Sequence, residues 1–198
     1  DVFEDRIPFS RSKGLIQVPT TCGTGSEMTG VAVIDITSKK SKIGKRIESS
    51  FADDVVLIPE LVKGLPYPFF LYSSVDALIH AMEIFACYKT STYDDLFCLE
   101  AIRTILSGYK KIIEEGPEAR FDQIGHFLKA SNYAGIALSN VLCGAVHALA
   151  MHFGSAHHVT HGKSNYRFLM SVFKVYARNS EHAKLQVIAD IIHDVLGT

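Results

Sequence analysis

The spacing of apolar residues changes near Pro66–Pro68, and this change constrains the fold more than any other feature of the sequence. Before it lie three short apolar runs with β-branched residues or a closing proline, as in strands, at 14–21, 31–36 and 55–61. From about Tyr67 the apolar residues recur every three or four positions, which is the period of a helix. We therefore expect an α/β segment over residues 1–66 and an all-α body over residues 67–198.

The helical body divides at its turn and breaker residues. A first long helix carries "SSVDALIHA" at its start, and a second runs from about Tyr93 to Glu115 and stops at Gly116-Pro117. A third covers about 121–138, and the small residues of 131–150 indicate a buried helix pair that neighbours approach closely. Two more helices are expected at about 164–178 and 180–196. In the first segment, the lysine-rich stretch 37–47 is most simply a solvated hairpin or loop.

Composition excludes several classes of protein. With 47% hydrophobic and 21% charged residues, the 198-residue chain can bury a core for one large or two small domains. A net charge of −1 argues against nucleic-acid and membrane-surface binding. The four cysteines lack CxxC spacing, which predicts free thiols in a reducing compartment. The chain shows no apolar run of about 20 residues and no signal-like start, so we expect a cytoplasmic location.

The stretch "PTTCGTGSEMT", residues 19–29, follows a predicted strand. Hydroxyls and backbone N–H groups at the end of a strand can hold phosphate or ribose oxygens. The stretch matches neither a P-loop nor GxGxxG. Taken alone, the pattern favours a polar turn in which glycine supplies positive φ.

Asp76 and His80 stand four residues apart, so they lie one above the other on the same helix face, with Glu83 and Cys87 extending a polar stripe. One interpretation is structural: Ser73 and Asp76 would form a capping box at the start of the helix. The other is a metal site, in which a carboxylate and an imidazole supply two ligands from one side.

Five histidines fall within residues 146–162, and two of them can complete such a site. His147 would come from the end of the small-residue helix pair. His161 would come from the following loop, where Gly162 allows a tight bend. The remaining three are His152, His157 and His158.

Three motifs in this order, "PTTCGTGSE", "VDALIHA" and "GAVHALA" with "HG" fourteen residues later, resemble the iron-containing (group III) alcohol dehydrogenases over essentially the whole chain. Within that family, "IQVPTTCGTGSE", "KGLPYPFF" and "SNYAGIA" look most like the 4-hydroxybutyrate dehydrogenases. The resemblance implies the family's architecture, which is shared with dehydroquinate synthase. The first segment would be the end of a Rossmann-like nucleotide domain, and the helical body would be the metal domain.

The resemblance also assigns roles to residues. It implies four metal ligands, Asp76, His80, His147 and His161. It implies NAD(P) contacts from Thr20, Thr21, Gly23 and Thr24, and from Thr29 and Lys42, with Lys40 or Lys45 as replacements for Lys42. Fe²⁺ is implied, with Zn²⁺ compatible with the ligand types, and the cofactor can be NAD or NADP.

The sequence departs from the family's pattern at several points. Met151 stands where relatives carry a histidine proposed as a proton relay, so the sequence assigns no residue to this role. His152, on another helix face, is the lesser alternative. Thr160 stands where relatives have proline. His157 and His158 are expected in the loop or in solvent. The family's Gly-Gly-Gly-Ser phosphate loop would precede this chain and further helices would follow it, so we expect a fragment of a homodimeric protein.

The expected activity is the interconversion of 4-hydroxybutyrate and succinate semialdehyde by hydride transfer, with the metal polarising the substrate oxygen. The sequence does not identify the cation that binds the substrate carboxylate; Lys89 is a candidate, although a solvated surface lysine is the favoured interpretation. Two alternatives remain from the sequence: a Zn²⁺ hydrolase, and a truncated metal-binding chain without catalysis. A structural zinc site is disfavoured because such sites prefer cysteine-rich coordination.

Overall fold

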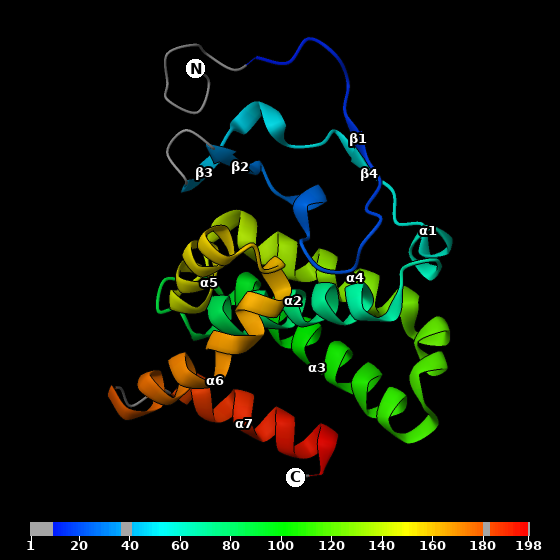
Figure 1. Cartoon of the computed structure of the whole chain (residues 1–198), viewed down its shortest axis with the longest axis vertical. Helices are drawn as coiled ribbons and strands as arrows, with labels where there is room; N and C mark the ends of the chain where they lie inside the picture. The colour runs from blue at the N-terminus through cyan, green and yellow to red at the C-terminus, as the bar shows by residue number, and fades with distance from the viewer. Residues whose placement is uncertain (1–9, 37–40, 180–182, 198) are drawn as a thin grey trace.

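The computed structural model describes residues 10–36, 41–179 and 183–197, and places four short strands in the first segment (Figure 1). They are β1 (Ile16–Gln17), β2 (Val31–Ile36), β3 (Ser41–Arg46) and β4 (Asp54–Val55). β1 pairs with β4 in parallel, and β2 pairs with β3 antiparallel, from Val31 opposite Arg46 to Ile36 opposite Ser41. The predicted strand at 31–36 is confirmed, and part of the lysine-rich stretch is the second strand of a hairpin.

Two of the expected strands are much shorter than predicted. Within 14–21 only two residues pair, and within 55–61 the strand β4 ends at Val55. Pro59 does not close a strand: it is the first residue of helix α1 (Pro59–Lys63). Proline suits this position because the first helical N–H has no partner within the helix and the ring already fixes a helical φ.

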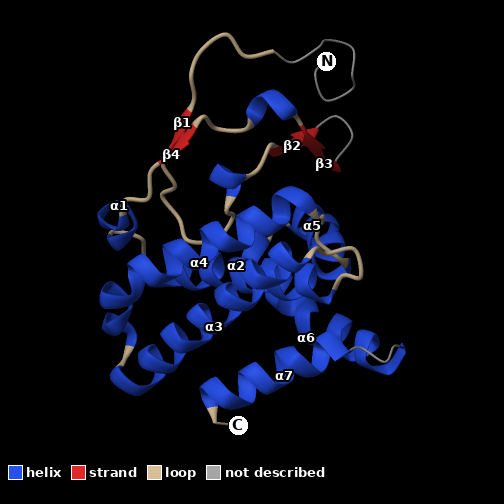
Figure 2. Cartoon of the chain, turned by 180° about the vertical axis from the view of Figure 1, so that it is seen from behind, coloured by secondary structure: helices blue, strands red, loops and turns tan. Residues whose placement is uncertain are grey.

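The helical body agrees with the expected order of helices (Figure 2). It contains α2 (Tyr67–Ala86), α3 (Thr92–Glu115), α4 (Arg120–Asn140), α5 (Ala145–His157), α6 (His161–Asn179) and α7 (Ala183–Leu196). The helix pair expected within 131–150 is the end of α4 and the start of α5. Residues 141–144 separate them, and the chain bends there by 100°.

Helix α2 is the centre of the core. Its apolar residues are buried on several faces, with Phe70, Ile79 and Ile84 fully inaccessible, because α3, α4 and α6 pack around it. By length and composition, α2 is the one unbroken helix among the described residues that is apolar enough to cross a membrane. However, 61% of its apolar window is buried inside the protein and it carries three buried ionisable side chains, so it is the core helix of this domain.

Glycines seat the loop of residues 19–29 directly on the helical body. A Cβ at Gly23 would overlap the backbone of Ser73 in α2, and one at Gly135 in α4 would overlap the backbone of Gly25. Gly25 itself has φ of 56°, in the left-handed region that glycine adopts without strain. The loop therefore lies on α2 and α4, as Figure 1 shows.

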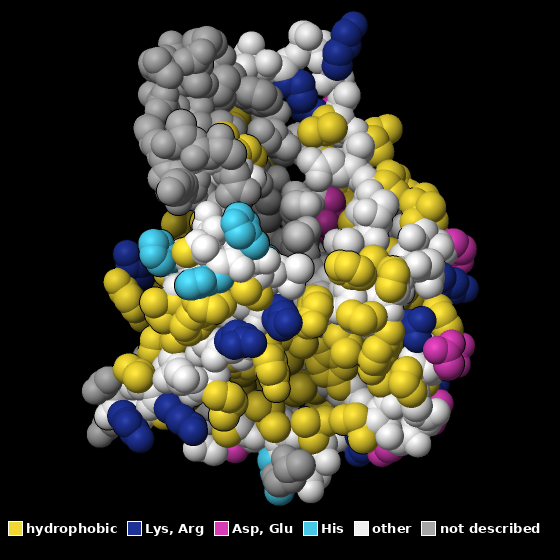
Figure 3. All heavy atoms as spheres, in the orientation of Figure 1, with side chains coloured by type: hydrophobic (Ala, Val, Ile, Leu, Met, Phe, Trp, Pro, Cys, Tyr) yellow, Lys and Arg dark blue, Asp and Glu magenta, His cyan; other side chains and the backbone are white. Residues whose placement is uncertain are grey.

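One face of the helical body carries an apolar groove, visible as a yellow hollow in Figure 3. It has a volume of about 410 Å³ and lies between α2, α3, α6 and α7. Its lining consists almost entirely of aromatic and aliphatic side chains: Tyr67, Leu71, Tyr72, Val75, Tyr109, Ile112, Ile113, Tyr166 and Leu196.

Candidate metal centre

Helix α2 carries three buried ionisable side chains, Asp76, His80 and Glu83, each less than 10% exposed. The helix begins at Tyr67, so Ser73 lies inside it and donates a hydrogen bond to the carbonyl oxygen of Phe70. The capping-box interpretation of Ser73 and Asp76 is therefore wrong. Because burying a carboxylate is costly without partners, Asp76 and Glu83 need specific ones.

Glu83 holds the start of helix α5. Its carboxylate accepts hydrogen bonds from the backbone N–H groups of Val146 (2.7 Å) and His147 (3.2 Å), and its Oε2 lies 2.7 Å from Nδ1 of the His147 ring. The first N–H groups of a helix have no partner within it, and the positive end of the helix favours a negative charge. Glu83 thus caps α5 and fixes the orientation of the His147 imidazole.

That orientation directs Nε2 of His147 towards Asp76, with 3.4 Å between Nε2 and Oδ1. His161, the first residue of α6, places its own Nε2 3.6 Å from the same oxygen. Ligand atoms of Asp76, His147 and His161 all lie within 4.8 Å of one another. Three helices thus bring one carboxylate and two imidazoles to a single point.

Asn165 lies one helical turn after His161 and contacts both His161 and Asp76. Its side-chain amide donates to Oδ1 of Asp76 at 2.6 Å and lies 3.2 Å from Nε2 of His161. The helix comes this close to α2 because residue 162 has no side chain: a Cβ there would overlap the carbonyl oxygen of Tyr72. Gly162 is therefore required for close packing, and the sequence-based explanation of a tight bend in a loop is wrong.

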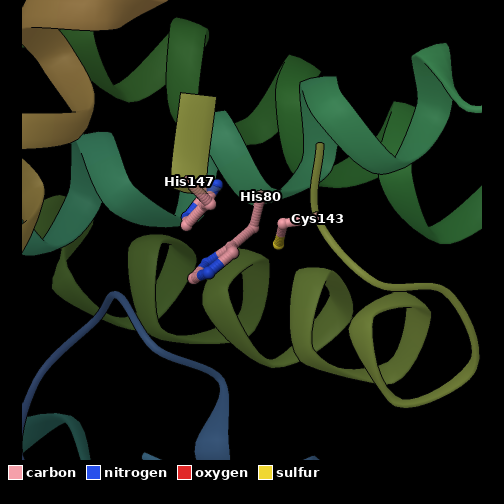
Figure 4. Close-up of side chains that lie close together, drawn as sticks. All are labelled: His80, Cys143 and His147. Carbon is pink, nitrogen blue, oxygen red and sulfur yellow. The ribbon is translucent and has the colours of Figure 1, made fainter. Parts of the chain in front are cut away.

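His80 lies beside this cluster. Its ring stacks on that of His147, with centroids 4.3 Å apart and planes 14° apart. Figure 4 shows His80, His147 and Cys143 together, and ligand atoms of these three also lie within 4.8 Å of one another. His80 is therefore a member of this second group, and His147 connects it to the group of Asp76 and His161.

The charges in this cluster stabilise one another. Burial raises the pKa of Asp76, but the charges of the three histidines and a hydrogen bond with His147 outweigh burial and bring the pKa to about 2. Burial lowers the pKa of His147, whereas hydrogen bonds with Asp76, Cys143 and Glu83 raise it well above the ordinary value. Asp76 is therefore a carboxylate at neutral pH, surrounded by imidazoles.

The donor set fits a divalent cation. Nδ1 of His80 is buried without a hydrogen-bond partner, and Nε2 of His147 has only the long 3.4 Å contact with Oδ1 of Asp76, which is unfavourable for a buried polar atom unless another group satisfies it. Carboxylate oxygen and imidazole nitrogen are ligands of both iron and zinc in proteins. These two nitrogens and the ionised Asp76 supply donors of these two kinds.

The other three histidines of residues 146–162 are exposed. His152 lies on the outer side of α5, His157 contacts the ring of Phe153, and His158 ends the helix with φ of 53°. None of the three belongs to a described cluster of potential metal ligands.

The predicted nucleotide residues divide into two groups. Thr20, Thr21 and Thr24 line a polar hollow of about 390 Å³ beside β1, together with Ser26 and Glu27. Gly23 and Thr29 are buried outside its lining, and the hydroxyl of Thr29 donates to the carbonyl oxygen of Ser26.

The structure provides less information on the lysines that the sequence suggested for binding the cofactor or the substrate carboxylate. Lys40 and the side chain of Lys42 lie outside the described residues, and Lys45 lies on strand β3 with its side chain half-buried. Lys89 is exposed, with its amine 5.4 Å from the centre of the Tyr88 ring.

Sequence reasoning did not assign roles to Glu83, Asn165 and Cys143. Glu83 was visible only as part of a polar stripe, seven residues after Asp76. Asn165 follows His161 at the i+4 spacing that places two side chains on one helix face, and this spacing was the available signal. Nothing in the sequence distinguished Cys143 from the other three cysteines, and none of the four forms a disulfide.

Comparison with known proteins gives matches along both parts of the chain. Residues 70–197 match the C-terminal part of the Fe-containing alcohol dehydrogenase family, and residues 2–59 match iron-containing alcohol dehydrogenase. The 4-hydroxybutyrate dehydrogenase of Clostridium kluyveri is 43% identical over 196 residues, which are 99% of this chain and 53% of that protein. The chain thus spans about half the length of the relatives it matches.

Solved structures have the same fold. An iron-containing alcohol dehydrogenase from Thermotoga maritima superposes with a TM-score of 0.83 at 26% identity, over 98% of this chain and 52% of that one. The sulfoacetaldehyde reductase of Bifidobacterium kashiwanohense, solved in complex with NAD⁺, gives a TM-score of 0.80 at 23% identity, over 93% of this chain and 52% of that one. The expected fold class, an α/β remnant followed by a helical domain, is confirmed.

Proposed function

This chain belongs to the iron-containing alcohol dehydrogenase family, and from that premise we propose that the protein is an NAD(P)-linked alcohol dehydrogenase acting on 4-hydroxybutyrate and succinate semialdehyde. The observation that carries the proposal is the convergence of Asp76, His147 and His161 within 4.8 Å, next to a loop that packs on the same helix. The substrate follows from the 43% identity to a 4-hydroxybutyrate dehydrogenase.

In this proposal Asp76, His80, His147 and His161 hold the metal ion, with Fe²⁺ expected from the family and Zn²⁺ compatible with the donors. When bound, the ion supplies a Lewis acid for the substrate oxygen and the nicotinamide supplies hydride exchange with the carbinol carbon. Glu83 fixes the His147 ring, and Asn165 holds the Asp76 carboxylate. Such supporting hydrogen bonds orient ligands and tune their basicity.

The loop of residues 19–29 would hold the cofactor. Thr20, Thr21 and Thr24 offer hydroxyls and backbone N–H groups in the hollow beside β1. Gly23 and Gly25 fix this loop against α2 and α4, so the hydroxyls are presented from a supported backbone. Both NAD and NADP remain in the proposal, as does assembly into a homodimer.

A hydrolase is not favoured, because the chain belongs to a dehydrogenase family and hydrolysis has no use for a nucleotide loop. The direct test is anaerobic purification with Fe²⁺, followed by NAD(P)H absorbance with 4-hydroxybutyrate. We expect activity that falls more than about a hundredfold in His147→Ala, since even residues that only support a ligand cost that much. His152→Ala, an exposed histidine on the same helix, should retain activity. Absence of any nicotinamide reduction would favour a non-catalytic metal-binding chain.

The carboxylate of 4-hydroxybutyrate calls for a cation, and Lys89, just after α2, is the candidate proposed. Lys89→Ala should raise KM for 4-hydroxybutyrate and leave KM for 1-butanol, which has no carboxylate, unchanged. An unaltered KM for 4-hydroxybutyrate would remove Lys89 from the substrate site.

A further inference from the structure

A second group of potential ligands lies next to the metal centre and includes a thiol. Cys143 sits in the break between α4 and α5, four residues before His147. Its Sγ lies within 4.8 Å of ring nitrogens of His80 and His147. In Figure 4 the sulfur projects from its loop towards the His80 side of the pair.

The three donors fit a different class of cation from the first group. Asp76, His147 and His161 offer one hard oxygen and two nitrogens, whereas His80, Cys143 and His147 offer two nitrogens and one soft sulfur. Thiolate selects thiophilic ions, and zinc binds both thiolate and imidazole tetrahedrally. With zinc–ligand bonds of about 2.0–2.3 Å, two tetrahedral ligands stand about 3.5 Å apart. The ligand atoms here lie within 4.8 Å of one another, so small side-chain rotations would bring them to this separation.

A buried nitrogen of His80 that lacks a hydrogen-bond partner indicates that a ligand binds here. Nδ1 of His80 has no hydrogen bond, and it cannot bond to solvent either, because His80 is only 6% exposed. A cation held between His80 and Cys143 would satisfy this nitrogen. Cys143 itself is half-buried and not in a disulfide, so its sulfur is available to an ion.

We propose that His80, Cys143 and His147 form a second, thiolate-containing site for a thiophilic divalent cation such as Zn²⁺ or Cd²⁺. His147 belongs to both groups, and His80 is also a ligand of the ion in the proposed function, so an ion in this site excludes one bound with Asp76 and His161. The identity of the bound metal then decides which side of His147 it occupies. This inference does not depend on the dehydrogenase reaction.

Cobalt is the probe, because a thiolate bound to Co²⁺ gives a near-ultraviolet charge-transfer band while d–d bands in the visible report binding by any ligands. We expect the metal-stripped protein titrated with Co²⁺ to show both. Cys143→Ser should lose the charge-transfer band, and Cys87→Ser, a matched half-buried cysteine after α2, should keep it. His161→Ala should also keep it, because His161 is not in the thiolate group.

A second measurement needs no variant. Zn²⁺ or Cd²⁺ should slow alkylation of Cys143 by iodoacetamide by roughly tenfold or more, with no change at Cys87, as read by peptide mass spectrometry. Equal protection of the two cysteines, or none at Cys143, would overturn the proposal.

The outcomes separate this site from the proposed function. Visible d–d bands without a charge-transfer band would overturn the thiolate site and leave the dehydrogenase proposal intact. A charge-transfer band lost in Cys143→Ser, together with no nicotinamide reduction, would support the thiolate site and contradict the dehydrogenase. A charge-transfer band of equal strength in Cys143→Ser would assign the sulfur to another cysteine and overturn the proposal.

Discussion

Glu83 organises the candidate metal centre from outside its two groups of potential ligands. Its carboxylate accepts three hydrogen bonds, two from the first turn of α5 and one from the ring of His147. Gln has one carbonyl oxygen and an amide that donates, so Glu83→Gln cannot satisfy all three donors. We expect this variant to bind Fe²⁺ or Zn²⁺ about 10–100-fold more weakly, as measured by isothermal titration.

The matched control for that variant is Glu114→Gln on the exposed side of α3, which should leave metal affinity unchanged. Metal binding by Glu83→Gln at the wild-type affinity would show that the carboxylate contributes nothing beyond packing.

At the scale of residues, the sequence indicated which side chains converge better than it indicated the contacts that hold them. The sequence pointed to Asp76, His80, His147 and His161 through residue type, spacing and the family resemblance. The structure gathers Asp76, His147 and His161 in one group and stacks His80 on His147 beside it. The contacts that hold them, from Glu83 and Asn165, join residues 63 to 89 positions apart. Local spacing carries no information on such pairs, because tertiary packing alone decides which helices meet.

Among the elements, the junction of the loop with α4 is set by two glycines. A Cβ at Gly135 would overlap the backbone of Gly25, which cannot move aside as a flexible side chain would. We expect Gly135→Ala to destabilise the protein by about 1–3 kcal/mol, the usual cost of overpacking, and to weaken NAD binding, as measured by urea unfolding and nucleotide titration.

Gly125→Ala on the same helix is the control with the opposite sign. Its Cβ would make an ordinary contact with Pro59, 3.7 Å from Cγ. Alanine in a helix interior is favoured over glycine by about 0.5–1 kcal/mol, so this variant should be slightly more stable. Wild-type stability and nucleotide affinity in Gly135→Ala would contradict the close approach.

Asp94 joins two other elements. It completes the capping box of α3 with Ser91 and accepts a hydrogen bond from Asn140 at the end of α4, 2.8 Å away. Burial raises the pKa of Asp94, but hydrogen bonds from Asn140 and Ser91 outweigh it and lower the pKa. Asp94→Asn loses the charge and places one amide donor against another, which should cost about 1–2 kcal/mol in urea unfolding at pH 7.

The lowered pKa also sets the sign of the pH dependence. A carboxyl group with a lower pKa in the folded state stabilises it above the unfolded value of about 3.9, and loses this effect as the pH falls through the folded value. The stability difference between wild type and Asp94→Asn should therefore shrink below about pH 4. A difference that is constant with pH would assign the effect to shape alone.

Element boundaries were predictable where local chemistry marks them and not elsewhere. The end of α3 follows from Gly116-Pro117, and β2 follows from its β-branched residues. The start of α2 was placed too late because Ser73-Ser74 resembles a cap, although the helix begins after Pro66. The strands β1 and β4 were overestimated because apolar residues there, such as Ile16, remain exposed and few backbone groups pair.

For the whole molecule, the candidate metal centre joins parts of the chain that are distant in sequence. Its donors come from α2, α5 and α6, and Asp76 and His161 are 85 positions apart. An ion that binds the folded chain and not the unfolded one adds about 2.7 kcal/mol of stability at a hundred times its dissociation constant.

For a chain of this size, that stability should raise Tm by about 5–10 °C when Fe²⁺ or Zn²⁺ is added, and a chelator should reverse the rise. Calorimetric scans of metal-loaded and chelator-treated protein measure this shift. His147→Ala should show a smaller rise in Tm on metal addition than the wild type, because His147 belongs to both groups of donors. His152→Ala, which changes an exposed histidine, should show the same rise as the wild type. An ion held by side chains from α2, α5 and α6 together is released when the chain unfolds, so its removal must lower Tm. An unchanged Tm on chelation would therefore show that no ion joins these three helices.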